Sequence, residues 1–276
     1  MSTPTDNNKN TTIPVPEAPK RKFTTIEQVF NEATGKDVAL VQDNEIYYLV
    51  LNRKDNTVNL QMIKQINECL DQLEKTKGPA CLVTLGTDQV AFSTGFDSEV
   101  WAQGVKQRYQ IALLFQRLMS RILTLPIPTC CVYTGHAFSA GLFLGLVHDF
   151  RMMKENKAQI ALSDLKVGGA IPPAYGITLR NLLNPEASRL LIYGGSYKGP
   201  QAKKLKVVDK LYKDNDDLIT KISLFAKEFS KQGDKRGALA EIKTNLHWEI
   251  KNALDTKGLS FGVIKNQLNY EPQPKL

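Results

Sequence analysis

The chain has 276 residues, of which 42% are hydrophobic and 23% are charged, and its formal net charge is +8. This composition is ordinary for a folded soluble protein, and the length is enough to bury a large core. The longest apolar stretch, near residues 137–147, is far shorter than the ~20 residues that cross a bilayer, so we expect no membrane span.

The positive charge is compatible with a nucleic acid, an anionic membrane or a phosphorylated small molecule as partner. The lysines are spread through the chain and no nucleic-acid motif stands out, so we expect no nucleic-acid partner. The four cysteines (Cys69, Cys81, Cys130 and Cys131) lack metal-ligand spacing. We therefore expect reduced thiols and no metal site.

The N-terminal part of the chain predicts no folded structure. Residues 1–22 are rich in Thr, Asn and Pro and lack the apolar segment of a secretory signal, which is typical of a disordered tail. Regular structure begins near residue 37: residues 37–42 and 45–52 predict two strands around a turn at Asp43–Asn44.

The middle of the chain alternates helices and strands. Residues 57–76 predict an amphipathic helix, with Met62, Ile63, Ile66, Leu70 and Leu73 on its buried face. The next expected elements are a buried strand over residues 80–86, a helix over 110–125 that Pro126 ends, a strand over 129–135, a helix through 141–147, and strands near 149–153 and 158–163.

The C-terminal third is predicted to be mostly helical after Gly194, over residues 200–210, 216–232 and 238–257. Alternating strands and helices followed by helices alone predict an α/β protein with a helical C-terminal portion.

Two stretches share one pattern: residues 91–101 (AFSTGFDSEVW) and 134–144 (TGHAFSAGLFL). Each follows a predicted strand and passes through glycine into a predicted helix, where the first backbone N–H groups have no intrahelical acceptor. Two such N–H groups that converge would stabilise the negative charge that develops on a carbonyl oxygen. A single turn of this kind often serves only the packing of a strand against a helix. The interpretation as an anion-stabilising site therefore depends on the presence of two such turns.

These stretches, together with residues 125–141 (LPIPTCCVYTGHAFSAG), 148–153 (HDFRMM) and 161–168 (ALSDLKVG), resemble the crotonase superfamily. Within the superfamily, the chain is most similar to the enoyl-CoA hydratase/isomerase group, and there to Δ3,Δ2-enoyl-CoA isomerases of the plant peroxisomal type.

The resemblance implies a crotonase (ClpP-like) fold of repeated ββα units. On this basis we expect a disordered tail over residues 1–22, a crotonase core over 23–210 and a helical oligomerisation region over 211–276. The family's assemblies imply a homotrimer or a hexamer.

The resemblance also implies the residues of the site. The backbone N–H groups of Phe96 and Ala140 would hold the thioester oxygen of a fatty enoyl-CoA. The remaining substrate-binding residues would be Ser93, Thr94, Gly95, Gly141 and Phe143. No cofactor is implied, because CoA is part of the substrate.

Two positions separate hydration from isomerisation in this family. Phe143 stands where hydratases carry a first acidic residue, and a phenyl ring can neither accept a proton nor orient a water molecule. Asp164 stands where the isomerases carry Glu, and one carboxylate is sufficient to move a proton from C2 to C4. Asp is shorter than Glu by roughly 1.3–1.5 Å.

Because Asp is shorter than the Glu of the family, the resemblance implies a weakened isomerase, and two alternatives to an isomerase stay open. Asp164 is also a residue type that caps helices and turns, and the chain would then be a catalytically silent structural or assembly subunit. The other alternative is a different acyl-CoA reaction, hydration or hydrolysis.

Other polar residues near these motifs have structural interpretations. Asp97 is expected to cap a helix, and His136 to be hydrogen-bonded near the turn. His148 and His247 lack partner spacing, and Ser139 lacks the surroundings of a nucleophile elbow.

The chain ends in Pro274, Lys275 and Leu276. This tripeptide resembles the peroxisomal address Ser-Lys-Leu, which predicts a peroxisomal import receptor as partner. A mitochondrial or cytoplasmic location is the alternative.

Overall fold

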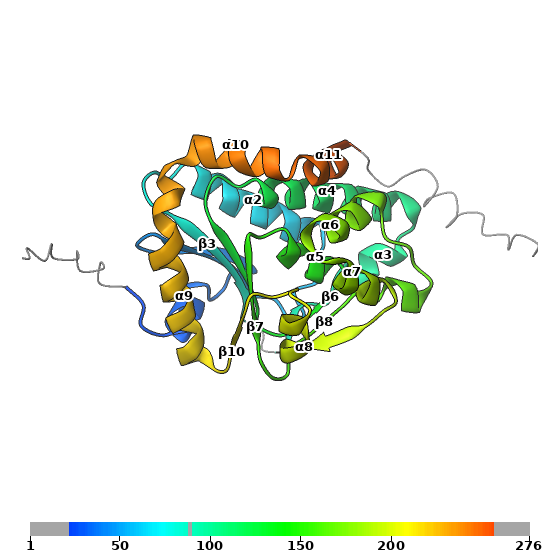
Figure 1. The fold of residues 1–276 in the computed structure, drawn as a ribbon, viewed down its shortest axis with the longest axis horizontal. Helices are drawn as coiled ribbons and strands as arrows, with labels where there is room; N and C mark the ends of the chain where they lie inside the picture. The colour runs from blue at the N-terminus through cyan, green and yellow to red at the C-terminus, as the bar shows by residue number, and fades with distance from the viewer. Residues whose placement is uncertain (1–21, 88–89, 257–276) are drawn as a thin grey trace, which may run out of the picture.

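The computed structural model describes residues 22–87 and 90–256 (Figure 1). Most of the predicted tail, residues 1–21, and the C-terminal tripeptide lie outside the described residues. The first described residue, Lys22, is tied to the fold, because its backbone N–H donates to Asp43 Oδ1 at 2.7 Å.

Two sheets form the centre of the protein. The larger has the strand order β1-β2-β3-β5-β7-β10, and the smaller has the order β4-β6-β8-β9. The strands of the larger sheet are β1 (Val38–Asp43), β2 (Ile46–Leu51), β3 (Cys81–Gly86), β5 (Thr129–Tyr133), β7 (Phe150–Lys154) and β10 (Lys210–Tyr212). Those of the smaller are β4 (Ala91–Ser93), β6 (His136–Phe138), β8 (Gln159–Ala161) and β9 (Ser196–Lys198).

The sheets arise from a repeated unit in which consecutive strands enter different sheets. β3 and β4, β5 and β6, and β7 and β8 are successive pairs, and each pair adds one parallel strand to each sheet. Helices follow each pair, so the repeat is ββα, as the resemblance implies. The repetition places the ends of β4, β6 and β8 side by side, which is where the site lies.

Thirteen helical segments surround the sheets in the described part of the chain. They are α1 (Ile26–Glu32), α2 (Leu60–Glu74), α3 (Ser98–Ala102), α4 (Val105–Leu123), α5 (Ala140–Leu146), η1 (Asp164–Val167), α6 (Pro173–Leu182), α7 (Pro185–Ile192), α8 (Gly199–Lys204), α9 (Asn215–Phe229), η2 (Ser230–Asp234), α10 (Arg236–Leu246) and α11 (Trp248–Thr256). Figure 1 shows α2, α4, α10 and α11 along one side of the larger sheet and α9 on another.

The larger sheet is buried on both faces, which explains why its strands are continuously apolar. One face packs on α2, α4, α5, α6 and α11, and the other packs on α1 and α9. Cys130 lies in the core between the sheet and the helices α1 and α9, and Cys131 lies in the core on the other face. These adjacent strand residues therefore point to opposite faces of the sheet. All four cysteines are free and buried.

Most of the long predicted elements are confirmed. The predicted buried face of α2 is buried at each of its five positions. The prediction missed the helices α1, α6 and α7 and the three-residue strands β4, β6, β9 and β10. It placed one helix over residues 200–210, where α8 ends at Lys204, and it extended another across His247, where the chain separates α10 from α11. No helix among the described residues is long and apolar enough to cross a membrane.

Candidate active site

Two glycines allow the two predicted turns to touch. A Cβ atom on Gly141 would lie 2.3 Å from Ser93 O, so only glycine lets the start of α5 pack against the end of β4. Gly95 has a φ of +101°, and a Cβ atom there would lie 3.1 Å from Phe138 O and 3.6 Å from Ala140 N. The backbone around Gly95 therefore lies directly against the amide of Ala140.

The orientation of the Phe96 amide follows from its neighbours. The N–H of Val58 donates to Gly95 O at 2.7 Å, and the N–H of Asp97 donates to Val58 O at 3.0 Å. In a trans peptide the C=O and N–H groups point in opposite directions. Because Gly95 O points to Val58, the N–H of Phe96 points away from it.

The Ala140 amide starts a helix. Ala140 is the first residue of α5, so its N–H has no acceptor within the helix. Ser139, just before it, has a φ of +45°, a conformation that non-glycine residues rarely adopt and that turns the chain sharply. Two backbone donors on facing segments can hold one oxygen atom that gains negative charge.

A pair of hydroxyl groups links this turn to Asp164. Ser139 Oγ lies 2.9 Å from Ser163 Oγ, and the N–H of Ser163 donates to Ser139 Oγ at 3.3 Å. The N–H of Ser139 donates to Ala161 O at 3.0 Å. Ser139 precedes Ala140 and Ser163 precedes Asp164, so these bonds hold the backbone that begins α5 next to the backbone that begins η1.

Asp164 begins η1 and is half-buried. Its Oδ2 atom is buried and has no hydrogen-bond partner among the described residues. The turn itself is closed by main chain, since the N–H of Gly169 donates to Asp164 O at 2.8 Å. The Oδ2 atom therefore caps no helix or turn in the part of the chain that the structure describes.

Two aromatic side chains, from α5 and α6, pack on each other. The rings of Phe143 and Tyr175 have centroids 4.3 Å apart. Burial, and then the charge of Asp164, raise the pKa of the Tyr175 phenol well above its usual value. Phe96 packs on the core through its ring, with the Phe115 centroid at 5.5 Å.

The remaining substrate-binding residues of the prediction lie at the same place. Ser93 is fully buried, and its Oγ donates to Asn56 O at 2.7 Å. Thr94 is exposed, and its N–H donates to Asp55 O at 3.0 Å. The loop at Asp55 and Asn56 thus holds the end of β4 in position before Gly95.

Sequence reasoning missed Tyr175. It lies in the first turn of α6, eleven positions after Asp164, behind a Gly- and Pro-rich loop that carries no helical or strand period. No periodicity in the sequence joins Tyr175 to Phe143, so only the fold brings their rings together.

The other polar residues have structural roles. Asp97 caps α3, because its Oδ1 accepts from the N–H of Glu99 at 3.0 Å. His148 is buried between Thr84 Oγ1 at 2.8 Å and Leu144 O at 2.9 Å, and burial lowers its pKa to about 4. The expected hydrogen bond of His136 is absent at Nδ1, and its ring stacks on Phe138 instead.

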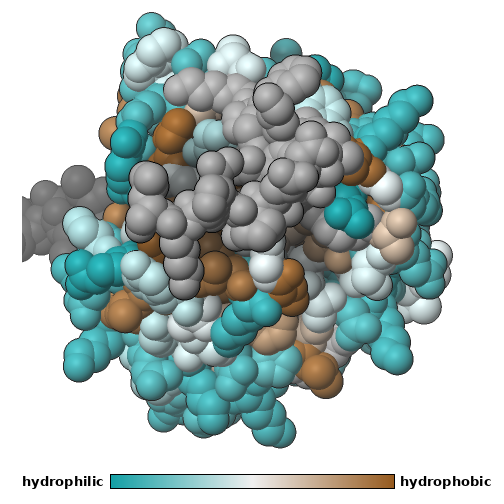
Figure 2. Space-filling view, turned by 90° about the vertical axis from the view of Figure 1, so that its right-hand side faces the viewer, coloured by the Kyte–Doolittle hydropathy of each residue, from teal (hydrophilic) through white to brown (hydrophobic). Residues whose placement is uncertain are grey.

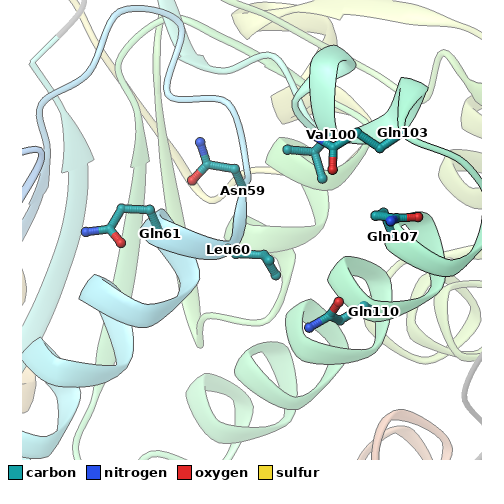
Figure 3. A pocket seen from close by; sticks show the side chains of 7 residues that line it. All are labelled: Asn59, Leu60, Gln61, Val100, Gln103, Gln107 and Gln110. Atoms are coloured by element: carbon teal, nitrogen blue, oxygen red, sulfur yellow. The ribbon is translucent and has the colours of Figure 1, made fainter.

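A separate surface cavity of about 270 Å³ lies between the start of α2 and the helices α3 and α4 (Figure 3). Leu60 lies in its middle, facing Gln103, Gln107 and Gln110. None of the predicted site residues lines it. No group of three or more metal-ligating side chains occurs among residues 22–87 and 90–256.

The chain is a crotonase-fold protein. Its ββα units each add one parallel strand to each of two sheets, and glycine turns bring two backbone amides together. Solved structures with this fold superimpose on most of the chain. The human mitochondrial delta3-delta2-enoyl-CoA isomerase has a TM-score of 0.72 at 18% identity, covering 84% of this chain and 94% of that one. A probable enoyl-CoA hydratase, EchA3, of Mycobacterium tuberculosis has a TM-score of 0.75 at 21% identity, covering 84% and 99%.

The sequence comparisons identify the family. The family model of enoyl-CoA hydratase/isomerase matches residues 42–261, and the chain belongs to this family. Enoyl-CoA delta isomerase 3 of Arabidopsis thaliana is 26% identical over 78% of this chain and 94% of its own length. The peroxisomal enoyl-CoA delta isomerase 2 of the same plant is 28% identical over 70% and 83%. A putative enoyl-CoA hydratase of Thermus thermophilus is also 28% identical, over 62% and 69%.

Proposed function

We propose that the chain is a Δ3,Δ2-enoyl-CoA isomerase in which Asp164 moves a proton from C2 to C4. The N–H groups of Phe96 and Ala140 hold the thioester oxygen. The observation that carries the proposal is the buried Oδ2 atom of Asp164, which has no hydrogen-bond partner among the described residues. The similarity to two plant enoyl-CoA delta isomerases supports it.

The reaction needs one base and one oxyanion hole. The Asp164 carboxylate takes a proton from C2, and the electrons of that C–H bond move toward the thioester, whose oxygen becomes the enolate oxygen. The two amides stabilise this charge. The protonated Asp164 then gives the proton to C4, so the double bond lies between C2 and C3 and no atoms or electrons are gained or lost.

Hydration is the competing reaction, because relatives called hydratases match at similar identity. Hydration requires a water molecule held next to the double bond, by groups that accept its hydrogens. Phe143 offers only a phenyl ring at the position where the family resemblance implies an acid. This favours isomerisation over hydration.

The assay is the conversion of trans-3-enoyl-CoA to the conjugated 2-enoyl-CoA, followed by the rise in ultraviolet absorbance. We expect turnover by the wild type and a loss on the order of 10²-fold or more in Asp164→Asn, since a positioned acid/base contributes this much. Asp164→Asn should retain the melting temperature and the acyl-CoA affinity of the wild type. Equal turnover by both proteins would overturn the role of Asp164.

The assay also separates the alternatives. Consumption of 2-enoyl-CoA with formation of a 3-hydroxy product would show a hydratase. An absence of turnover with either substrate would show a catalytically silent member of the family.

We further propose that the CoA thioester is the substrate and that no cofactor is required. A homotrimer or hexamer is supported by exposed apolar side chains on α10 and α11, where Leu246 is 73% and Trp248 65% exposed. Apolar patches are also visible among polar residues on the face drawn in Figure 2. A peroxisomal location is supported by the peroxisomal plant relatives.

A further inference from the structure

Four large apolar side chains lie exposed on two segments of the surface, and the proposed reaction uses none of them. Leu165 and Val167 belong to η1 and are 55% and 82% exposed. Ile192 ends α7 and is 42% exposed, and Tyr193, the next residue, is 74% exposed. Exposed apolar side chains that lie together mark a surface that contacts another molecule.

The pairing of β8 with β9 brings these two segments together. The strands are antiparallel, with Ala161 opposite Ser196. The residues that follow β8 therefore lie beside the residues that precede β9. The side chain of Lys166 shows the contact, since a Cβ atom on Gly194 would lie 2.9 Å from its Cε atom and 3.2 Å from its Cγ atom. The four apolar side chains thus form one group, the apolar end of the β9 edge.

The other end of the β9 edge is basic. Lys198 ends β9, and Lys157 lies in the turn between β7 and β8. The start of α8 packs on this turn, because a Cβ atom on Gly199 would lie 2.7 Å from Glu155 O. The exposed lysines of these elements, the basic end of the β9 edge, are Lys157, Lys198, Lys203 and Lys204. None of them forms an ion pair within the described part of the chain, and they outnumber the one acid of the turn, Glu155.

We propose that the β9 edge binds the surface of a bilayer that carries anionic headgroups. The apolar end enters the interfacial region of the bilayer, and the lysines of the basic end lie at the level of the headgroup phosphates and carboxylates. Apolar side chains next to lysines are the combination that binds proteins to anionic membrane surfaces. Tyr193 fits the headgroup level, because its ring is apolar and its hydroxyl is polar.

The arrangement of the edge favours a bilayer over a second copy or a nucleic acid. A symmetric contact between two copies through this edge would place lysines against lysines or against apolar side chains. A nucleic acid backbone would use the lysines but leave the aliphatic side chains exposed, because it is bound through charge and hydrogen bonds. A bilayer uses both ends. The inference does not depend on the proposed function, since membrane binding requires no turnover.

The test removes each end of the β9 edge separately. The basic-end variant combines Lys157→Gln with Lys198→Gln, and the apolar-end variant combines Val167→Ser with Tyr193→Ser. All four side chains are exposed, so both variants should keep the melting temperature of the wild type.

Helix α9 supplies the matched control, because Figure 1 shows it on the opposite side of the molecule from α7 and β8. Leu224 is 53% exposed on α9, and Lys227 is exposed on the same helix. The control variant combines Leu224→Ser with Lys227→Gln, so it removes the same kinds of side chain from the other side.

The measurement is co-sedimentation with vesicles of phosphatidylcholine, with and without phosphatidylserine. We expect the wild type to bind only the vesicles that contain phosphatidylserine, and to lose this binding in about 1 M salt, where the Debye length is about 3 Å. The basic-end variant should bind on the order of 10-fold more weakly, because each lysine near an anionic surface contributes about fivefold. The apolar-end variant should also lose on the order of 10-fold, since its side chains no longer leave water. The control should bind like the wild type.

Four results would overturn the inference. The first is a wild type that does not bind phosphatidylserine vesicles, and the second is an equal loss of binding in the control variant. The third is binding of the wild type to single-stranded RNA but not to vesicles. The fourth is a change of oligomeric mass in the apolar-end variant, seen by light scattering, without a change in vesicle binding, because the edge would then be a contact between copies.

Discussion

Gly95 is the residue at which the two halves of the site meet. Its positive φ turns the chain after β4, and a Cβ atom there would lie 3.1 Å from Phe138 O and 3.6 Å from Ala140 N. A methyl group would therefore press on the Phe138 carbonyl, which would have to shift by a few tenths of an ångström. Gly95 is therefore required for two separate reasons, one conformational and one steric.

The substitution Gly95→Ala should lower both the stability of the protein and its isomerase activity. The control Gly78→Ala should lower the stability alone. Gly78 also has a positive φ, of +82°, but no atom lies within 4 Å of the place where its Cβ would stand. We expect both variants to lose about 1 kcal/mol or more in urea denaturation. Only Gly95→Ala should lose isomerase activity, on the order of 10²-fold. Equal activity in the two variants would contradict the proposed role of the amides.

For single residues, the sequence could predict which ones act through their main-chain groups and to which face of a sheet a strand residue points. The opposite orientations of Cys130 and Cys131 follow from the strand period, and the structure confirms them. The roles of Asp164, Phe96 and Ala140 rest on the family resemblance and remain predictions. Tyr175 could not be predicted, because its packing on Phe143 depends on how the loop before α6 folds back.

Helix α10 is attached to the larger sheet by a buried ion pair. Lys243 Nζ lies 2.5 Å from Asp149 Oδ2 and donates to Ile127 O at 2.8 Å. Asp149 Oδ2 also accepts from the N–H of Thr129 at 2.8 Å. The lysine side chain is only 6% exposed. Desolvation lowers the pKa of Lys243, and Asp149 opposes this effect.

Removal of this charge should destabilise the fold much more than removal of a surface charge. We expect Lys243→Met to lower the free energy of unfolding by about 3 kcal/mol, because a buried charge and a buried carbonyl lose their partner. The matched control is Lys64→Met, which breaks the exposed pair with Glu68 and should cost about 0.5 kcal/mol or less. Urea denaturation measures both. Similar losses in the two variants would contradict the structural role of the buried pair.

Long elements with a clear period could be predicted from the sequence, and short ones could not. Helix α2 has fifteen residues with a regular apolar face, and its start is marked by Asn59, whose side chain accepts from Met62 N. Strands β4, β6, β9 and β10 have three residues each, too few for a period to be recognised. These short strands form because each of them pairs with a neighbouring strand in the folded protein.

The side chain of His148 forms hydrogen bonds with two different elements, a strand of the larger sheet and helix α5. Leu144 O accepts from Nδ1–H, so Nε2 is the unprotonated atom that accepts from the Thr84 hydroxyl. Thr84 lies in β3, and Leu144 lies in α5, whose first residue is Ala140. Protonation at Nε2 would remove the acceptor of the Thr84 hydroxyl proton, so this hydroxyl would have to turn and accept from Nε2–H, and it would place a charge in the core.

The stability of the whole molecule should therefore fall in mild acid. The pKa of His148 is about 4 in the folded protein, below the value of 6.5 for an exposed histidine. The unfolded chain binds the proton first as pH decreases, so stability is complete above pH 6.5 and is lost from there toward pH 4. The slope for one proton is about 1.4 kcal/mol per pH unit, or about 2 kcal/mol between pH 6.5 and 5.

The measurement is the free energy of unfolding against pH for the wild type and His148→Asn. An asparagine at this position can still donate to Leu144 O, but it does not titrate. The other ionisable groups are the same in both proteins, so the difference between the two slopes isolates His148. Identical slopes over this pH range would contradict the assignment.

At the scale of the whole molecule, the sequence predicts the class but not the arrangement. Alternating strands and helices predict α/β architecture, and the family resemblance implies the ββα repeat that the structure confirms. The division into two sheets and the pairing of β10 with β7 depend on contacts between residues far apart in the chain. Local propensity carries no information about such contacts.

The most direct test of the account is a crystal structure of the protein with hexanoyl-CoA, a saturated thioester that cannot isomerise. We expect the thioester oxygen within ~3 Å of both the Phe96 and the Ala140 nitrogen atoms. An Asp164 carboxylate oxygen should lie within ~3.5 Å of C2. A thioester oxygen bound away from these amides, or an Asp164 side chain turned away from C2, would contradict the proposed mechanism.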